Sequence, residues 1–182
     1  MKFYLLEKPD WFTGEIDILR FHQGVNYQDF ADNRMYRLPK RLMLYTKNKE
    51  YGEYPDILLD PLPLFSENMW MSILQFMDEP LHTHFILMEE KTGQARHYYS
   101  PDFKRIKGRV IRNKEEGERT TASLLLEGNV PENVPILYLE EARGIWVMVQ
   151  LDIAESFIRR GLCDVKLLPV DKEVIENGIY QF

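Results

Sequence analysis

One pattern occurs twice in this sequence: an apolar, strand-like run leads into an amphipathic helix with a polar cap. The clearer copy is IWVMVQLDIAESFIRRGLCDVKLLPV. Asp152 stands there at an N-cap position, and Glu155 three residues later completes the spacing of a capping box. Gly161 favours the end of this helix, because glycine readily adopts the left-handed conformation found at that place. The pattern predicts a strand, a helix over residues 152–160 with Phe157 and Ile158 facing the core, and a further strand.

The earlier copy is DILLDPLPLFSENMWMSILQFM, in which Pro61 and Pro63 separate the apolar run from the helix. Ser66 stands at the N-cap position, and the predicted helix continues to about Met77. Its apolar side chains recur with helical spacing and predict one face turned to a core. These side chains belong to Met69, Trp70, Ile73, Leu74 and Met77.

Between these two copies, HFILMEEKTGQARHYYS reads as a β-hairpin, with Gly93 in a left-handed turn position. If the turn centres on residue 92, residue 84 pairs with residue 100, and His97 points to the face opposite His84. A shift of one residue in this register would bring the two imidazoles onto the same face.

Composition and length favour one ordinary domain. The chain has 182 residues, of which 45% are hydrophobic and 13% aromatic, enough to bury a sizeable core. It contains no fixed-period repeat and no linker that would divide it. We therefore predict an α+β fold, a single domain over residues 1–182, with a mixed or mostly antiparallel sheet covered by a few helices.

Cysteine content and hydropathy indicate a cytoplasmic protein. Cys163 is the only cysteine, so the chain cannot form an intrachain disulfide. The N-terminal segment MKFYLLEKPDW contains too short an apolar run for the core of a signal peptide. No stretch approaches the roughly 20 apolar residues of a membrane span, so we expect no membrane association.

The net charge of −6 is unevenly distributed. Residues 104–114 carry six Lys and Arg and no acid, so the remaining residues carry −12. A general nucleic-acid binder needs a dominant basic surface, so this balance argues against nucleic acid as the partner. The basic run is most simply a solvated strand and loop.

We find no convincing catalytic or metal motif. His82 and His84 lie on one face if their segment is a strand, but two ligands do not complete a metal site. Cys163 is most simply a small buried hydrophobe, because a nucleophilic cysteine needs a neighbouring base. Pairs such as Glu140 and Glu141 flank turns or edges, where carboxylates are usually solvated. We therefore expect no cofactor, no metal and no enzymatic activity.

The chain resembles the immunity proteins of bacterial polymorphic toxin systems, in particular the group called immunity protein eleven. The similar segments are MKFYLL, LPKRLMLY, DILLDPLPLFSENMWMSIL, HYYSPDF and VQLDIAESFIRRGLCDVKLLPV, and they cover about two thirds of the chain. Residues 20–34 and 112–144 are not covered. The resemblance carries patterns of packing and capping but no catalytic residue.

This resemblance implies a non-enzymatic protein that binds a cognate toxin tightly and neutralises it. The acidic balance suits a basic partner such as a nuclease. Acidic loop residues, represented by Glu132, Glu140 and Glu141, are the expected contacts, because loops commonly carry binding function. Tyr99 is a further candidate, since only one of the adjacent tyrosines 98 and 99 can face the core.

Two other classes stay open from the sequence. One is a small-molecule-binding protein or enzyme with a pocket near His82, His84 and Tyr99, which a convergent polar pocket would favour. The other is an oligomeric structural protein, which a large symmetric apolar patch would favour. The sequence does not indicate an oligomeric state.

Overall fold

The computed structural model describes residues 2–9, 12, 16–48, 54–114, 120–131, 133–142, 144–162 and 164–175. Its elements form two compact units. The barrel unit comprises Met1–Glu7, Phe103–Arg160 and Lys166–Phe182, and the sheet unit comprises Lys8–Asp102 and Gly161–Val165. The prediction of one domain over residues 1–182 stays a prediction.

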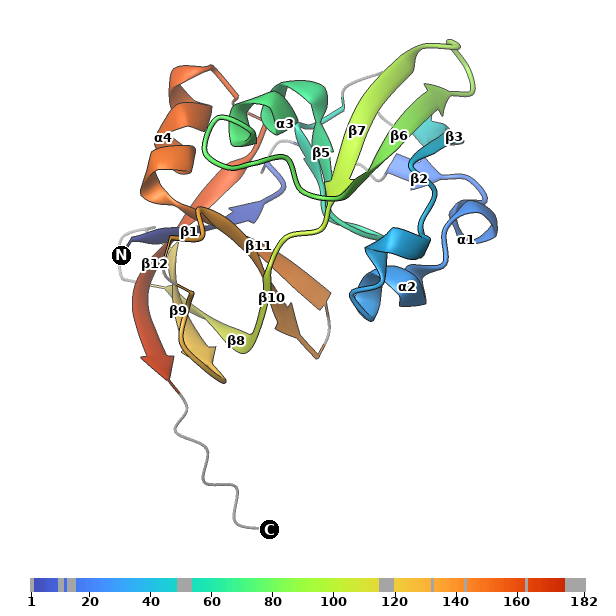
Figure 1. Cartoon of the computed structure of the whole chain (residues 1–182). Helices are drawn as coiled ribbons and strands as arrows, with labels where there is room; N and C mark the ends of the chain where they lie inside the picture. The colour runs from blue at the N-terminus through green and yellow to red at the C-terminus, as the bar shows by residue number, and fades with distance from the viewer. Residues whose placement is uncertain are drawn as a thin grey trace. The chain divides into compact units, whose positions relative to one another are not determined.

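Six strands of the barrel unit close into a barrel in the order β1-β11-β10-β8-β9-β12 (Figure 1). Neighbouring strands are antiparallel except for two parallel pairs, β8 with β10 and β9 with β12. The helix α4 contacts β1 and β11. The bounds are β1 (Phe3–Glu7), β8 (Arg105–Lys114), β9 (Thr120–Leu126), β10 (Ile136–Glu141), β11 (Gly144–Gln150), α4 (Leu151–Arg159) and β12 (Lys166–Ile175).

The barrel encloses an apolar core built from alternate positions of its strands. The buried side chains of this core come from every strand except β8, which contributes Ile106 and Val110 packed against it. Its fully or nearly fully buried members are Phe3, Leu5, Ala122, Leu124, Leu126, Leu137, Leu139, Met148, Leu168 and Val170. Because the strands bury these faces against one another, the barrel needs no layer of helices to cover them.

The sheet unit contains a six-stranded sheet in the order β2-β3-β6-β7-β5-β4. Only β3 and β6 among these neighbours are parallel. Its strands are β2 (Ile16–Ile18), β3 (Arg41–Asn48), β4 (Ile57–Leu58), β5 (Leu64–Ser66), β6 (His82–Glu89) and β7 (Ala95–Pro101). Its helices are α1 (Phe21–Gly24), α2 (Tyr27–Ala31), the 3-10 helix η1 (Met35–Arg37) and α3 (Glu67–Ile73).

The predicted α+β class is wrong. The structure is mostly β, with a closed barrel and a half-barrel sheet in place of one sheet covered by helices. The two predicted helices exist, but α3 has seven residues and α4 has nine. Helices this short cover little of either set of strands. None of the helices within the described ranges combines the length and the apolar character that a membrane span requires.

The start of α3 agrees with the sequence, whereas the start of α4 does not. Ser66 caps α3, because its side chain accepts a hydrogen bond from Met69 N at 3.3 Å. In α4 the N-cap is Gln150, whose side chain makes no capping bond, and Asp152 lies inside the first turn. The predicted Asp152 cap is therefore wrong. Gly161 follows the helix with φ of 69°, as predicted.

The apolar faces of the two helices also differ from the expectation in part. Trp70 and Ile73 of α3 are buried, as predicted, and so is Phe157 of α4. Leu74 is half-buried. Ile158 is 67% exposed, so the prediction that it faces the core is wrong. The buried face of α4 consists of Ile153, Ala154 and Phe157. Ile158 follows Phe157 by one residue and therefore lies further around the helix, off this face.

We expect Ser66→Ala to lower the free energy of unfolding by about 1 kcal/mol, the usual cost of a lost N-cap. The side chain of Ser66 also donates to Asp56 Oδ1 at 2.5 Å, so this value is a lower estimate. Asp152→Ala removes only a charge from the first turn of α4 and should cost about 0.5 kcal/mol or less. Urea titrations of both variants compare the two values, and equal losses would contradict these assignments.

A second prediction concerns Gly108, where β8 approaches its neighbours closely. A Cβ atom there would lie 2.7 Å from Leu125 O and 2.8 Å from a methyl carbon of Leu139. Gly108→Ala should therefore destabilise the protein by about 1–3 kcal/mol through overpacking. Gly128→Ala is the matched control, since a Cβ there meets nothing within 4 Å. Thermal melts should separate the two variants, and similar melting temperatures would overturn this description of the barrel.

Candidate functional site

One face of the sheet unit is turned to solvent and carries large apolar and aromatic side chains. Side chains alternate between the two faces of a strand, and directly paired residues share a face. On β3, Met43 is 53% exposed and Tyr45 is 51% exposed, while Leu44 between them is buried. We call this surface the open face. Its members are Arg41, Met43, Tyr45, His82, His84, Ile86, Met88, His97 and Tyr99.

The opposite face of the same strands forms the buried side. Phe85 and Leu87 of β6 are fully buried there, and Phe21 of α1 stacks on Phe85 with ring centroids 6.5 Å apart. Tyr98 of β7 also points to this side, is 2% exposed, and donates its hydroxyl hydrogen to Pro55 O at 2.6 Å. The prediction that only one of the two adjacent tyrosines faces the core is confirmed, and Tyr99 is the one on the open face.

The β6–β7 hairpin is confirmed, but its register differs by one residue from the predicted one. His84 pairs with Tyr99 and Ile86 with His97. The reason is the turn, in which Gly93 has φ of 70° and Glu89 N donates to Gln94 O at 2.9 Å. This closes a four-residue loop, so the turn centres between residues 91 and 92. The consequence is that His97 shares the open face with His84 and Tyr99.

Four rings stack along this part of the open face. Trp70 of α3 stacks on Tyr99 at 5.6 Å between centroids, and Tyr99 stacks on His84 at 4.8 Å with the planes 5° apart. His84 continues the column to His97 at 5.0 Å. His82 lies beside it, 5.4 Å from Trp70. Aromatic pairs at such separations are favourable beyond the burial of their surface.

Hydrogen bonds fix the protonation of this histidine pair. Arg41 Nε donates to His84 Nδ1 at 3.2 Å, and arginine can only donate. His84 Nδ1 is therefore the acceptor, and its proton lies on Nε2, which is 2.8 Å from His97 Nδ1. The chain of donation thus runs from Arg41 through His84 to His97. Burial, and then the neighbouring His97 and Arg41, lower the pKa of His84, which favours its neutral form.

The two facing histidines do not amount to a metal centre in the part of the chain that is described. There, no three or more His, Cys, Asp or Glu side chains are grouped so as to hold a metal ion. The expectation that the protein has no metal stays a prediction.

The other predicted contact residues lie in the barrel unit or outside the described residues. Glu140 pairs with Arg105 at 3.0 Å, and Glu141 accepts a hydrogen bond from the indole nitrogen of Trp146 at 2.9 Å. Both end β10, so they lie on a strand and already have partners. Glu132 lies outside the described residues, and so does Cys163.

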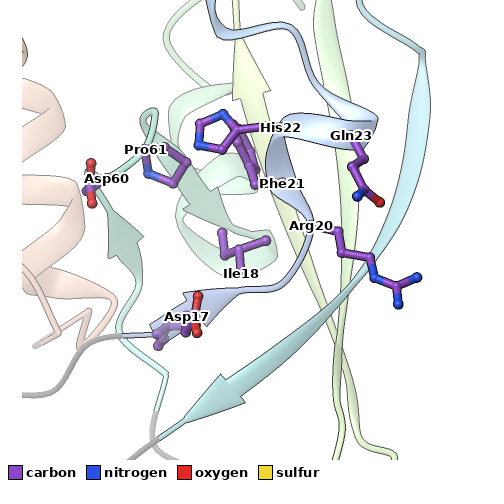
Figure 2. Close-up of a pocket in the computed structure, with 9 residues that line it drawn as sticks. Asp17, Ile18, Arg20, Phe21, His22, Gln23, Asp60 and Pro61 are labelled. Carbon is purple, nitrogen blue, oxygen red and sulfur yellow. The ribbon is translucent and has the colours of Figure 1, made fainter.

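Sequence reasoning missed a hollow of about 720 Å³ in the sheet unit, between β2, α1 and the segment that follows β4. Figure 2 shows Asp60 and Pro61 on one side of it, Arg20 and Gln23 on the other, and Ile18 and Phe21 between them. Arg20 adopts the left-handed conformation with φ of 56°. The polar lining side chains are exposed, so the hollow offers a small ligand charged groups but little enclosure.

A second hollow of about 540 Å³ lies along β3 and is lined by Leu19, Arg20, Gln23, Gly24, Leu42, Met43, Leu44, Tyr45 and Glu90. Neither hollow includes His82, His84 or Tyr99, around which the sequence suggested a pocket. Those three side chains lie instead on the open face.

Comparisons with protein-family models, with curated proteins and with solved structures found no significant match to this chain.

We expect His84 to titrate below the ordinary histidine pKa of about 6.5. Its folded pKa is lowered, so its contribution to stability is present above about pH 6.5 and is lost as the pH falls through the folded pKa. NMR titration of the ring signals measures this pKa, and melts at pH 7 and pH 5 measure the stability. His97→Gln should raise the pKa of His84, because it removes the electrostatic effect by which His97 lowers that pKa. A pKa of His84 at or above 6.5 would contradict the hydrogen-bond assignment.

Proposed function

We propose that this chain is an immunity protein that binds a cognate bacterial toxin and inhibits it without catalysing a reaction. On this proposal it acts in the cytoplasm, where it meets the toxin made beside it. The sequence resemblance is one line of support. The open face of the sheet unit is the other, and it is the observation that carries the proposal.

The composition of the open face is that of an interface centre. Its members are Met, Tyr, His, Ile and one Arg, and the same face continues at the β2 edge to the charged, exposed pair Lys47 and Asp17, which lie at its rim. Interface centres are enriched in aromatic residues, Met and Arg and are depleted in the other charged residues. Met43 and Tyr45 each leave about half of their surface in water, as the values of 53% and 51% show. A protein partner that covered them would remove apolar area from water, which favours binding.

The distribution of charge supports a basic partner for the sheet unit. Its two ranges contain ten Lys or Arg and sixteen Asp or Glu, a net charge of −6. The ranges of the barrel unit contain thirteen of each kind and are neutral. The whole acidic excess of the chain therefore belongs to the unit that has the open face. Such an excess steers a basic partner toward this unit and raises the association rate.

Acidic side chains also flank the open face. Glu79 Oε1 lies 3.5 Å from His82 Nδ1, and Glu67 and Glu79 act electrostatically on Tyr99 and raise its pKa after the larger effect of burial. At the other end Glu90 pairs with Lys47 at 3.4 Å. We therefore place the toxin contact on the open face with these carboxylates at its rim. This replaces Glu140 and Glu141, which belong to the barrel unit and not to the unit that has the open face.

The alternative is a small-molecule-binding protein or an enzyme that uses His82, His84 and Tyr99. The chain of hydrogen bonds from Arg41 to His97 is the observation in its favour, since such a chain can pass a proton. Neither of the two hollows described above includes these residues, whereas the open face does. A catalytic group needs a site that holds its substrate close by. The inhibitor is therefore the better supported proposal.

The test is co-expression with the toxin domain encoded in the neighbouring reading frame. We expect protection from killing and one-to-one inhibition by the purified protein. Tyr45→Lys places a cation on the open face and should weaken toxin binding at least about tenfold, the size of effect expected at an interface centre. Ile111→Lys is the matched control, because Ile111 of β8 is 48% exposed in the barrel unit.

Circular dichroism first shows that both variants are folded. Calorimetry then measures and compares their affinities for the toxin. Equal losses in the two variants would remove the open face from the interface. A toxin that still kills in the presence of abundant, folded protein would overturn the proposed function. Turnover of a small molecule by the purified protein would favour the alternative.

A further inference from the structure

One edge of β3 in the sheet unit is only partly used. The strand has eight residues, but β2 pairs only with residues 46–48 of it. One further bond, from Leu19 N to Tyr45 O at 2.8 Å, extends this contact. Arg20 then turns the chain into α1 with a left-handed conformation, φ 56° and ψ 27°. Among the described elements, no strand pairs with residues 41–44 on this side.

The backbone groups of this edge point outward from the sheet. Lys40 O and Thr46 O accept hydrogen bonds from His84 N at 2.9 Å and from Glu90 N at 3.0 Å, on the β6 side. The N–H and C=O of one strand residue point to the same side, and successive residues alternate. Arg41, Met43 and Tyr45 therefore point their backbone groups away from β6. The N–H and C=O of Met43 face the unpaired side.

The second hollow described above runs along this same edge. Four consecutive residues of β3, 42–45, line it, although their side chains alternate between the two faces. Only a hollow beside the strand can contact all four. Its other wall is formed by Leu19, Arg20, Gln23 and Gly24 at the start of α1. Its volume of about 540 Å³ leaves room for a short segment of chain.

Proteins normally protect such edges with a proline, a bulge, a lysine or a covering segment. Residues 42–44 are Leu, Met and Leu, and they provide none of these side chains. Met43 is also 53% exposed. An apolar edge whose outward backbone groups face a hollow suits binding by strand addition.

We propose that an extended segment of the partner protein adds to this edge as a strand. The backbone of this segment forms hydrogen bonds with the backbone groups of Met43 and Arg41. Alternate side chains of the segment are apolar and pack beside Met43 and Tyr45. A carboxylate in the segment lies near Lys40 and Arg41, which are both exposed. The identity of the partner as a toxin rests on the proposed function, whereas the mode of binding does not.

Charge favours a partner's segment over a second copy of this chain. Pairing between two copies of β3 would bring together two sheet units that each carry a net charge of −6, and like net charges repel. A partner's carboxylate beside Lys40 and Arg41 would be attracted. We therefore assign the edge to another protein, and we treat pairing with a second copy as an outcome that the experiment can detect.

The experiment selects peptides on the purified full-length protein from a phage-displayed library of random heptapeptides. We expect enriched peptides to alternate apolar residues and to carry a carboxylate. Synthetic versions are then measured by calorimetry against Met43→Pro, which removes the outward N–H and leaves the pairing with β6 intact. Met43→Thr is the matched control, since it keeps the N–H. Proline should weaken binding at least about tenfold, and threonine by about threefold or less.

Hydrogen exchange on the unmodified protein covers the case in which Met43→Pro does not fold. The Met43 amide should exchange at least about tenfold more slowly in the presence of saturating peptide, because it gains a partner. The Leu42 amide, which points toward β6, should change little. Unchanged exchange at Met43, or full-strength peptide binding by folded Met43→Pro, would overturn the proposal. A dimer that this substitution abolishes would also overturn it, by making a second copy the occupant.

The two proposals can fail separately. If peptides bind in a manner that depends on Met43 but the neighbouring toxin is not inhibited, the edge stands and the immunity function fails. If folded Met43→Pro inhibits the toxin at full strength, strand addition fails and the immunity function stands.

Discussion

The register of the β6–β7 hairpin determines what the sheet unit presents to solvent. Gly93, in its left-handed conformation, closes a four-residue loop that pairs His84 with Tyr99. The hydroxyl of Tyr98, donated to Pro55 O, secures the same register from the buried side. A slip of one residue would turn Tyr98 outward and take His97 and Tyr99 away from His84. The ring column and the hydrogen-bond chain from Arg41 both depend on this pairing.

Local features of the fold could be predicted from the sequence, and the closure of the barrel could not. The Ser66 cap, the hairpin around Gly93 and the helix end at Gly161 each depend on a few adjacent residues. The α+β class failed because closure depends on pairing between distant segments, such as β8 with β10 and β9 with β12. Hydrophobic periodicity identifies strands but does not say which strands pair. Asp152 failed as a cap because the helix already begins at Leu151, with Gln150 as its N-cap.

The candidate site was predictable only in part. Tyr99 was found because adjacent tyrosines cannot share a face, and His84 because it lies two residues from His82. The exposure of Met43 and Tyr45 was missed. In RLMLYT, apolar side chains occupy successive positions, and this pattern is typical of a strand that is buried on both faces. The confinement of the acidic excess to the sheet unit was also missed, because it follows from how segments distant in sequence divide between the units.

The central claim is that the sheet unit provides the surface on which the chain binds its partner. Hydrogen–deuterium exchange of the full chain, with and without the toxin that we propose as its partner, tests this claim most directly. We predict slower exchange in β3, β6 and β7 and unchanged exchange in β8 and β10. Slower exchange confined to β8 and β10, with β3, β6 and β7 unaffected, would contradict it.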